Sequence, residues 1–326
     1  ANDYTLLEMS RVLLQDGFRN GLAEKVSDPG LRDWLAWFNN LTPQQRHEQV
    51  TSTLIRLNQL IHHRDVALVI GQQQSTFSLG NAIEGRQVFL AALTPARLQS
   101  AAYLLGGLLA TELIHIFMRR LTTGFESRQA AYVVFDEFDR IVPEAVCDFV
   151  SQAGKTGCRL TLIGQSPRMI DRRIREAVLA NCTNRILFGL VGPEALELAQ
   201  QFFEPDPLLV KEMVGDVRPI YYTPHEQWAF RAARLQELPP HTYFVVTAGS
   251  SKVQRLRLPH FQPVPAETLE TLRRVVLERY TRPRAEVVEE IQRRRRELDR
   301  RFGPLDEGLP PPPGEEPPGP RVHAPW

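Results

Sequence analysis

The sequence predicts an α/β protein in which a mainly parallel sheet is covered by helices, with helical regions added at both ends. Two observations lead to this fold class. Short apolar runs alternate with amphipathic segments between residues 65 and 202, and these runs lack the polar alternation of a strand with one wet face. Strands of a parallel sheet are buried on both faces, so continuous apolar runs joined by helices are typical of such a sheet.

The first 63 residues are expected to be helical. Pro29 and Pro43 follow Asp28 and Thr42, which is the order of a cap residue and a first-turn proline at the start of a helix. From Pro43 onward, apolar residues recur at spacings of three and four, as on one face of a helix. Nothing in this region has the pattern of a strand.

The elements of the predicted core follow in order. Strands are expected at Val66–Ile70, Gln87–Leu93, 131–136, 158–164 and Arg185–Leu190. Helices are expected at 95–120, 143–153, 168–180 and 193–202. A terminal β-hairpin is expected further on, because a Gly-Ser-Ser-Lys turn separates the apolar runs Thr242–Ala248 and Val253–Leu258.

The long apolar helix at 95–120 is expected to be a core helix and not a membrane span. Ala101–Met118 is almost wholly apolar, but Glu112 and His115 interrupt it. A charged residue near the middle of a bilayer is costly. A helix buried between a sheet and neighbouring helices explains the segment better.

Two arginine-rich segments are expected to be solvated. Arg168, Arg172, Arg173 and Arg175 share the predicted helix 168–180 with acidic residues. Between Arg284 and Arg301 the sequence has seven arginines and five acids, including the consecutive run Arg293–Arg296. Acids lie three and four residues from these arginines and can pair with them on a helix. This second helix is therefore predicted to be solvated or to bind a partner.

Proline dominates the end of the chain, where the last 23 residues hold nine of the 25 prolines. Such a composition cannot bury a core, so a disordered tail is expected there. The predicted organisation is a helical region at 1–63, a core at 64–261, charged helices at 262–303 and a proline-rich tail at 304–326.

Composition excludes some kinds of site. The formal net charge of the 326 residues is +1, so global electrostatics favour no particular partner. The three cysteines are too few and too scattered for a disulfide framework or a zinc site, and a reducing, cytoplasmic setting is expected. The chain begins at Ala1 with neither an initiator methionine nor a leader, as expected of a fragment.

Polar side chains follow two neighbouring strands of the predicted sheet. The apolar run Tyr132–Phe135 leads directly into Asp136 and Glu137, and the next strand ends at Gly164 and Gln165. Because the carboxyl ends of parallel strands meet at one edge of a sheet, where ligands bind, these side chains are expected to lie side by side. The alternative interpretation is that the two acids only solvate the end of a strand.

A phosphate-binding loop is missing from the sequence. The only Gly-Lys-Thr is Gly154-Lys155-Thr156, and Phe149 stands where such a loop needs its first glycine. These residues also precede a predicted strand instead of joining a strand to a helix. The backbone cradle that holds phosphates is therefore not expected there.

The sequences of residues 132–138, 154–157, 160–166 and 181–188 together resemble the FtsK–HerA superfamily of P-loop ATPases. Within that superfamily they are most similar to the conjugative coupling proteins and the related type IV secretion ATPases. The resemblance covers about residues 65–260. It implies the second half of a RecA-like three-layer fold, with residues 1–63 as the end of an all-α insertion.

The resemblance also implies roles for individual residues. Asp136 would hold Mg²⁺ through water, Glu137 would activate the attacking water, and Gln165 would sense the γ-phosphate of ATP. About ten residues before the glutamine, the family tends to place an arginine that acts on the neighbouring subunit's nucleotide. Lys155 stands there and lacks the planar bidentate fork of arginine. Lys155 is one candidate for the trans-acting cation and Arg185 the alternative; a third option is that trans activation is lost.

The implied function is that of the C-terminal part of a hexameric, ATP-driven DNA translocase of conjugation or type IV secretion. Such a ring would act in the cytoplasm at the inner face of the membrane, on DNA, with secretion-channel or relaxosome proteins as partners. Without the phosphate loop, this chain alone is predicted not to hydrolyse ATP. The alternative is a non-catalytic ATPase-like adaptor that docks secretion substrates or partner proteins. Whether the chain is a fragment or a natural protein without the loop, and whether DNA or protein is moved, stay open at this point.

Overall fold

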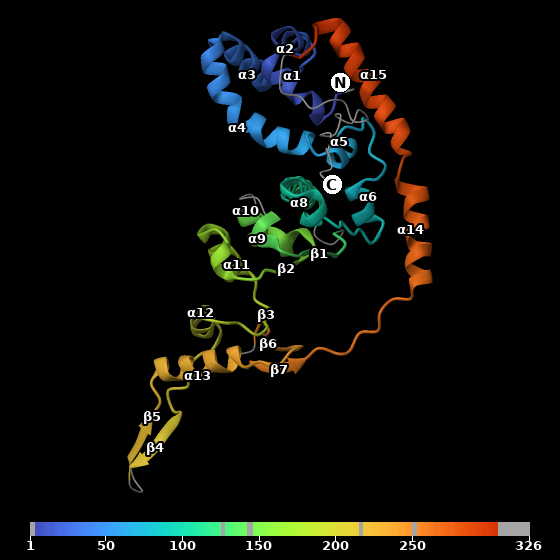
Figure 1. The fold of residues 1–326 in the computed structure, drawn as a ribbon. Helices are drawn as coiled ribbons and strands as arrows, with labels where there is room; N and C mark the ends of the chain where they lie inside the picture. Colours follow the sequence, from blue (N-terminus) through green and yellow to red (C-terminus); the bar gives the residue numbers. More distant parts are fainter. Residues whose placement is uncertain (1–3, 125–127, 142–145, 215–217, 250–252, 306–326) are drawn as a thin grey trace, which may run out of the picture. The chain divides into compact units, whose positions relative to one another are not determined.

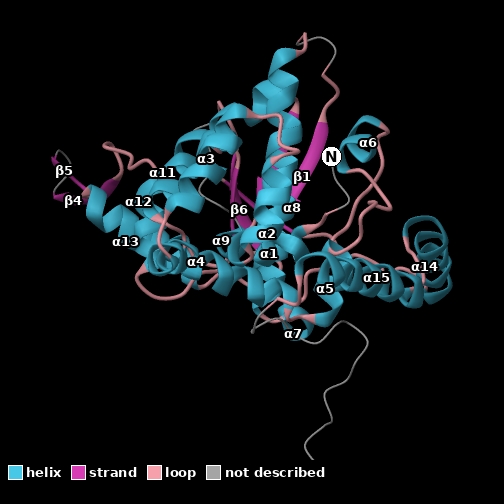
Figure 2. Cartoon of the chain, turned by 90° about the horizontal axis from the view of Figure 1, so that it is seen from above, coloured by secondary structure: helices cyan, strands magenta, loops and turns pink. Residues whose placement is uncertain are grey.

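The computed structural model of the protein describes all residues except 1–3, 125–127, 142–145, 215–217, 250–252 and 306–326 (Figure 1). The chain divides into two compact units. The first unit consists of residues 1–116, 141–143 and 265–326, and the second of residues 117–140 and 144–264. Both helices and strands are present, and helices predominate (Figure 2).

Helices of very different lengths make up the N-terminal part of the first unit. Their bounds are η1 Leu6–Glu8, α1 Met9–Leu14, α2 Asp16–Ala23, α3 Pro29–Asn40, α4 Pro43–Ile61, α5 Arg64–Ile70, α6 Leu79–Glu84, α7 Pro95–Leu98 and α8 Ser100–Arg119. The Asp28 side chain accepts a hydrogen bond of 2.7 Å from the Leu31 N–H at the start of α3. Thr42 and Gln45 form a reciprocal capping box at the start of α4. The two predicted helix starts are therefore confirmed.

The predicted strand at Val66–Ile70 is wrong, because this segment is the helix α5. Val66, Ala67 and Leu68 are buried in succession. Val66 packs in a cluster with Leu60 of α4. Surrounding helices thus bury adjacent residues on different sides of α5, and this packing overrides the strand propensity of its β-branched residues.

The predicted strand at Gln87–Leu93 is also absent. Val88 and Leu90 are each 87% exposed, and among the described residues this segment pairs with no strand. Phe89 does contact Phe77, with ring centroids 5.1 Å apart. An extended segment needs a hydrogen-bonding neighbour to become part of a sheet, and the described chain supplies none here.

The predicted helix 95–120 is interrupted after one turn. Gln99 has a φ of 50°, which ends α7 before α8 begins at Ser100. Of the described residues, Ser100–Thr122 form one helical stretch that is long and apolar enough to cross a membrane by length and composition. A third of its most apolar window, 33%, is buried inside the structure.

The C-terminal helices are α14 (Ala266–Tyr280) and α15 (Arg284–Phe302). α15 returns to the N-terminal helices and buries Val287, Ile291 and Leu298 on one stripe. Val287 and Ile291 pack with Leu68 of α5 in a hydrophobic cluster. The prediction of a solvated or partner-binding helix holds for the exposed face alone, because the other face of α15 belongs to the core of its own unit.

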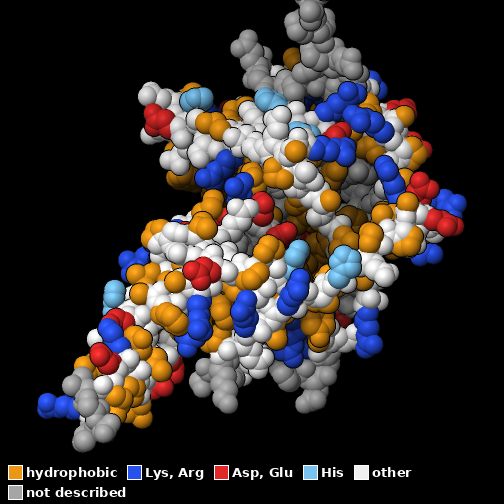
Figure 3. All heavy atoms as spheres, turned by 60° about the horizontal axis from the view of Figure 1, so that its bottom comes forward, with side chains coloured by type: hydrophobic (Ala, Val, Ile, Leu, Met, Phe, Trp, Pro, Cys, Tyr) orange, Lys and Arg blue, Asp and Glu red, His pale blue; other side chains and the backbone are white. Residues whose placement is uncertain are grey.

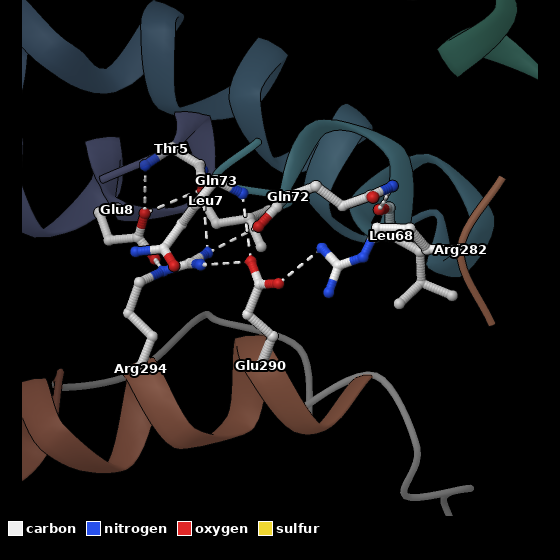
Figure 4. A network of polar contacts seen from close by, with 10 residues as sticks. Thr5, Leu7, Glu8, Leu68, Gln72, Gln73, Arg282, Glu290 and Arg294 are labelled. Carbon is white, nitrogen blue, oxygen red and sulfur yellow. Dashed lines mark hydrogen bonds and ion pairs between the residues drawn. The ribbon is translucent and has the colours of Figure 1, made fainter. Parts of the chain in front are cut away.

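A polar network fastens α15 in place (Figure 4). Arg294, only 7% exposed, donates from Nε to Glu8 Oε1 at 2.8 Å and from Nη2 to the Gly71 carbonyl at 2.8 Å. Glu290 pairs with Arg282 at 2.7 Å. A side chain at Gly71 would collide with its surroundings, since a Cβ there would lie 2.5 Å from a methyl carbon of Leu7. The same Cβ would lie 2.9 Å from Ile291 Cδ1 of α15, so the close packing of η1 and α15 around the end of α5 favours glycine.

The strands of the second unit form three small sheets. Their bounds are β1 Ala131–Phe135, β2 Cys158–Leu162, β3 Arg185–Leu187, β4 Val210–Val214, β5 Arg218–Tyr221, β6 Thr242–Val246 and β7 Gln254–Arg257. β1 and β2 pair in parallel, whereas the order β3-β6-β7 and the pair β4-β5 are antiparallel. The terminal hairpin β6–β7 is as predicted. The mainly parallel sheet is not, because among the described strands parallel pairing is limited to β1 and β2, and β3 pairs with β6 instead of extending that sheet.

Helices and turns connect these strands. Their bounds are η2 Arg120–Thr122, α9 Phe138–Ile141, α10 Val146–Gln152, η4 Ala153–Thr156, η5 Pro167–Met169, α11 Arg172–Asn181, α12 Glu194–Phe202 and α13 Pro224–Gln236. A core of small and large apolar residues joins α12 to α13 and consists of Ala195, Ala199, Phe203, Ala232 and Leu235. The alternation of helix and strand after residue 131 follows the prediction, although the sheets that it produces are small.

Candidate functional site

The parallel pair β1–β2 carries the two polar strand ends that the sequence singles out. Its register runs from Ala131 opposite Cys158 to Phe135 opposite Leu162. Pairing continues one step further, because the Ile163 N–H donates to the Phe135 carbonyl at 2.9 Å. The two strands thus leave the sheet side by side at their carboxyl ends, as predicted.

Asp136 and Glu137 form the turn between β1 and α9. Asp136 is exposed, and its Oδ1 accepts a hydrogen bond of 3.0 Å from the Glu137 N–H. Glu137 is half-buried and has a φ of 50°, in the left-handed region. This conformation costs about 1–2 kcal/mol for a residue with a Cβ. Strain of this kind is concentrated at functional sites, so the turn is the first candidate in the unit.

Neighbouring backbone contacts hold Glu137 in this strained conformation. The Phe138 N–H donates to the Ile163 carbonyl at 3.0 Å, and the Arg140 N–H donates to the Glu137 carbonyl at 3.0 Å. Residues on both sides of Glu137 are therefore tied down, one to the end of β2 and one within α9. A relaxed conformation at Glu137 would break one of these bonds.

Gln165 follows β2 after Ile163 and Gly164, and its side chain is exposed. Gly164 lets α9 lie against the strand end, since a Cβ there would meet the Phe138 ring at 3.1 Å and 3.3 Å. Spacing of 3.0–3.4 Å is tighter than ordinary van der Waals contact, so a larger residue would push α9 away. Gly164 thereby keeps the acidic turn and Gln165 at the same edge.

Sequence reasoning missed Asp139, which lies in the first turn of α9. Its Oδ1 is buried and has no hydrogen-bond partner among the described atoms, and it lies 3.4 Å from the position of a Cβ on Gly164. A buried carboxylate oxygen without a donor is costly. The signal in the sequence is its position three residues after Asp136, one helical turn along from the acidic pair.

The carboxyl edge of the β1–β2 pair can bind a cation that keeps most of its water ligands, but its described side chains do not surround a cation. In the described part of the chain, no group of three or more His, Cys, Asp or Glu side chains is placed to bind a metal. Mg²⁺ is usually held by one or two carboxylates together with water and substrate phosphates. Asp136 is exposed, and within the described ranges the one hydrogen bond of its side chain is that of Oδ1 with the Glu137 N–H, so its other oxygen fits that mode of binding.

Lys155 lies away from this edge in its own chain. It is exposed in η4, which precedes the amino end of β2, and Thr156 beside it is buried with its hydroxyl donating to the Ala153 carbonyl at 2.7 Å. A strand of five residues is about 16 Å long at roughly 3.3 Å per residue. Lys155 and Gln165 therefore stand at opposite ends of β2. As expected, the Gly-Lys-Thr is a turn before a strand and not a phosphate loop.

Arg185 begins β3 and uses its guanidinium within the chain. Nε donates to the Cys182 carbonyl at 3.0 Å, and Nη2 donates to the Leu179 carbonyl, so both bonds close the C-terminus of α11. The guanidinium also lies over the Phe202 ring, 5.1 Å from its centroid. Arg185 is thus half-buried and stabilises the junction of α11, β3 and α12.

Comparison with known proteins gives little further guidance. No family model matches the chain, and no curated protein matches it significantly. Among solved structures, the chain is similar to a bacterial conjugative coupling protein, TrwBdeltaN70 in an unbound monoclinic form, with a TM-score of 0.45 and 13% sequence identity. The match covers 79% of this chain and 63% of that chain, so this chain spans less than two thirds of its length.

Proposed function

We propose that this chain is the second half of the nucleotide-hydrolysing core of a ring-forming, ATP-driven DNA translocase of conjugation or type IV secretion. One observation carries the proposal: Asp136 and Glu137 end one strand of a parallel pair, and Gln165 follows the other at the same edge. We base it on this arrangement and on the motifs that resemble the FtsK–HerA superfamily, and not on the structural similarity. Two strand-end acids beside an amide suit phosphate chemistry better than a purely solvating role.

Each residue has a distinct role in this proposal. Asp136, exposed at the strand end, holds the hydration shell of Mg²⁺. Glu137 orients and polarises the attacking water from a turn that backbone hydrogen bonds of its neighbours hold in place. Gln165 reports the state of the γ-phosphate to the rest of the unit. Bound Mg²⁺ supplies charge neutralisation for the phosphates.

The exposed face of β1 supports the proposal that further elements of the ATPase core pack against this chain. Tyr132 is 82% exposed and Val134 is 60% exposed on one face of β1. Parallel strands occur almost only in sheets whose two faces are covered. Additional strands and helices that carry the phosphate loop would cover this face and complete the three-layer core. Without them, the chain alone would bind nucleotide weakly and would not hydrolyse it.

Lys155 is the better candidate for a cation that acts on the neighbouring subunit. Its side chain is exposed at the amino end of β2, away from its own chain's acidic pair. Arg185 already bonds two carbonyl groups and contacts Phe202. In a hexameric ring, the amino edge of one subunit would face the carboxyl edge of the next. DNA would pass through this ring, which would act in the cytoplasm at the inner face of the membrane and contact secretion-channel or relaxosome proteins.

A non-catalytic adaptor is the second candidate, because the hairpin β4–β5 exposes a set of large apolar side chains (Figure 3, lower left). The set with its flanks comprises Leu208, Leu209, Val210, Met213, Ile220, Tyr221 and Tyr222. Exposed apolar surface of this kind is typical of protein-binding sites. An adaptor would use it to dock secretion substrates or partner proteins, and would have no use for the strained glutamate.

The test is to join this chain to a segment that carries the phosphate loop and to measure ATP hydrolysis. The joined protein should hydrolyse ATP with Mg²⁺ and be stimulated by DNA. Glu137→Gln should abolish turnover and leave ATP binding largely intact, because the change removes a charge that acts mainly in the transition state. Asp136→Asn should also weaken binding of Mg²⁺ with nucleotide. Glu204→Gln, the same chemical change at an exposed residue after α12, is the matched control. Turnover by the Glu137 variant as fast as that of the parent would favour the adaptor.

A further inference from the structure

The arginines of α15 include one on the buried face of the helix and three on the opposite face. Arg294 points inward and shares the buried stripe with Val287, Ile291 and Leu298. Arg293, Arg296 and Arg300 lie on the opposite face at spacings of three and four residues, and all three are exposed. At 100° per residue these three positions fall within about 60° of one another. The structure thus separates one buried anchor, Arg294, from an outer basic stripe, defined here as Arg293, Arg296 and Arg300; Arg295 lies on neither of these two faces.

The charge of this outer basic stripe is not compensated. Among the described residues, no ion pair forms with any of its three arginines, although Glu289 and Glu297 lie within helical pairing distance in the sequence. The Arg300 Nε bonds only to the Arg296 backbone carbonyl, at 3.3 Å. The acids that form ion pairs on this part of the helix are turned toward other residues: Glu290 pairs with Arg282 and Arg294, and Asp299 pairs with Arg11.

The other arginine cluster in the chain behaves differently. On and just before α11, Arg172 pairs with Glu176 at 2.8 Å, and Arg168 and Arg175 approach Glu197 at 3.3 Å and 3.6 Å. Intramolecular acids therefore pair with three arginines of that cluster: Glu176 does so as predicted, whereas Glu197 of α12 was not predicted. Within the part of the chain that the structure describes, the outer basic stripe of α15 has no such neutralisation, so it is the better candidate for an external anion.

The surroundings of the stripe limit the kind of partner. None of the large apolar residues of α15 is among the exposed ones of the described chain, because they face the core of the unit. A membrane-binding helix needs a free apolar face, and a protein interface needs apolar anchors among its charges. Neither is present among the described residues of α15; the exposed apolar side chains nearest in the sequence belong to α14, and Leu269, Leu272 and Val276 are among them. A contact made by charge alone fits a polyanion whose charges are regularly repeated.

A nucleic-acid backbone has this character. The three guanidinium groups are distributed over about 10 Å of helix at 1.5 Å rise per residue, and a duplex presents one phosphate charge per roughly 1.7 Å of its axis. The planar fork of arginine also matches the geometry of phosphate oxygens. We propose that the outer basic stripe of α15 binds the phosphodiester backbone of a nucleic acid, independently of base sequence and outside the acidic edge of the second unit.

The experiment measures binding of the whole chain to a fluorescently labelled single strand and to a labelled duplex of about 20 nucleotides, by anisotropy over a series of salt concentrations. The triple variant Arg293→Gln, Arg296→Gln, Arg300→Gln should bind at least about tenfold more weakly at low salt. For this variant, the slope of the logarithm of the binding constant against the logarithm of the salt concentration should become less steep by about 2 to 3. Each lost phosphate contact removes about 0.7–0.9 from this slope. Replacing the same three arginines by lysine should restore most of the slope, because the charges return.

The matched control removes the same charge from exposed arginines of other helices in the first unit: Arg32→Gln, Arg56→Gln, Arg64→Gln. Binding by this control should stay within about twofold of the parent. An equal loss in control and test variants would overturn the proposal, since net charge alone would then explain binding. Competition by polyglutamate as strong as that by nucleic acid, at equal charge, would also overturn it in favour of an acidic protein. If the chain bound anionic vesicles through these arginines and did not bind nucleic acid, the proposal would also be overturned, and a membrane would be the partner. No nucleotide is hydrolysed in this assay, so its outcome is independent of the proposed ATPase function.

Discussion

Arg294 and Glu8, separated by 286 residues in the sequence, form a buried ion pair in which Arg294 Nε lies 2.8 Å from Glu8 Oε1. Their side chains are 7% and 9% exposed. The pair joins the last described helix to the first. Arg294 Nη2 donates to two further acceptors, the Gly71 carbonyl and the Thr5 hydroxyl, whereas the buried Nη1 has no hydrogen-bond partner among the described atoms and lies 3.6 Å from Glu290 Oε1. Loss of one partner leaves the other charge buried without compensation.

Arg294→Met and Glu8→Gln should each detach α15 from the N-terminal helices. Breaking one side of a buried pair costs roughly 3–5 kcal/mol, whereas the double variant should cost less than the sum of the two. Amide hydrogen exchange in α15 measures the free energy of this opening. Arg296→Met, in the same run but exposed, should change it by less than about 0.5 kcal/mol. Equal effects of the Arg294 and Arg296 variants would contradict the assignment of Arg294 as the anchor.

Gly71→Ala should also loosen α15. The new methyl carbon would stand 2.5 Å from Leu7 Cδ1, 2.6 Å from the Ala67 carbonyl oxygen and 2.9 Å from Ile291 Cδ1. Overpacking of this kind costs roughly 1–3 kcal/mol. Gly154→Ala is the control, because a Cβ there meets nothing within 4 Å. Thermal unfolding should show a lower midpoint for the first variant only.

The left-handed backbone of Glu137 predicts how different substitutions at this position rank in their effect on stability. Glycine adopts positive φ without a steric penalty, so Glu137→Gly should leave the second unit as stable as before or stabilise it by up to about 1 kcal/mol. Glu137→Val should destabilise it, since a β-branched residue is disfavoured at a φ of 50°. The rate of amide hydrogen exchange in the β1–α9 segment measures the stability of each variant and distinguishes Glu137→Gly from Glu137→Val. If valine were tolerated as well as glycine, the strain at this turn would not exist.

Glu226 gives a prediction about pH. The ion pair with Lys211, followed by hydrogen bonds from the Thr223 backbone and hydroxyl, lowers the pKa of Glu226 from 4.5 to about 2. A lowered pKa stabilises the folded state above the ordinary value, and this contribution is lost as pH falls from about 4.5 toward 2. The contact between β4 and the start of α13 should therefore persist at pH 3.5 and be lost near pH 2. NMR titration of the Glu226 carboxyl carbon measures this pKa directly, and Lys211→Met should move it upward. A pKa near 4.5 in the parent would disprove the contact.

Cys158 reports on the integrity of the parallel pair. Burial raises the pKa of its thiol to about 12, so almost no thiolate is present at neutral pH, and the thiolate is the reactive form. In the folded chain, Cys158 should react with iodoacetamide at pH 8 about tenfold or more slowly than the half-buried Cys147. In urea the two rates should become equal. A fast reaction of Cys158 without denaturant would mean that β1 and β2 are not stably paired.

Local signals in the sequence determined the helix starts and the site edge. Asp28 and Thr42 cap the helices that Pro29 and Pro43 begin, because a cap acts within one turn and needs no distant partner. The apolar run before Asp136 likewise predicted both the strand and its polar end. The pairing of β1 with β2 was predictable because a short strand–helix–strand connection favours parallel neighbours.

Tertiary structure alone decided the rest. Val66–Ile70 is a helix because other helices bury it on several sides, and Gln87–Leu93 stays unpaired because the described chain offers it no neighbouring strand. Whether Arg294 or Arg296 turns inward depended on Glu8 and Gly71, which lie more than 200 residues away in the sequence. Periodicity shows which residues of a helix share a face. It does not show which face meets a distant partner, because that depends on the free energy of contacts that exist only once the chain has folded.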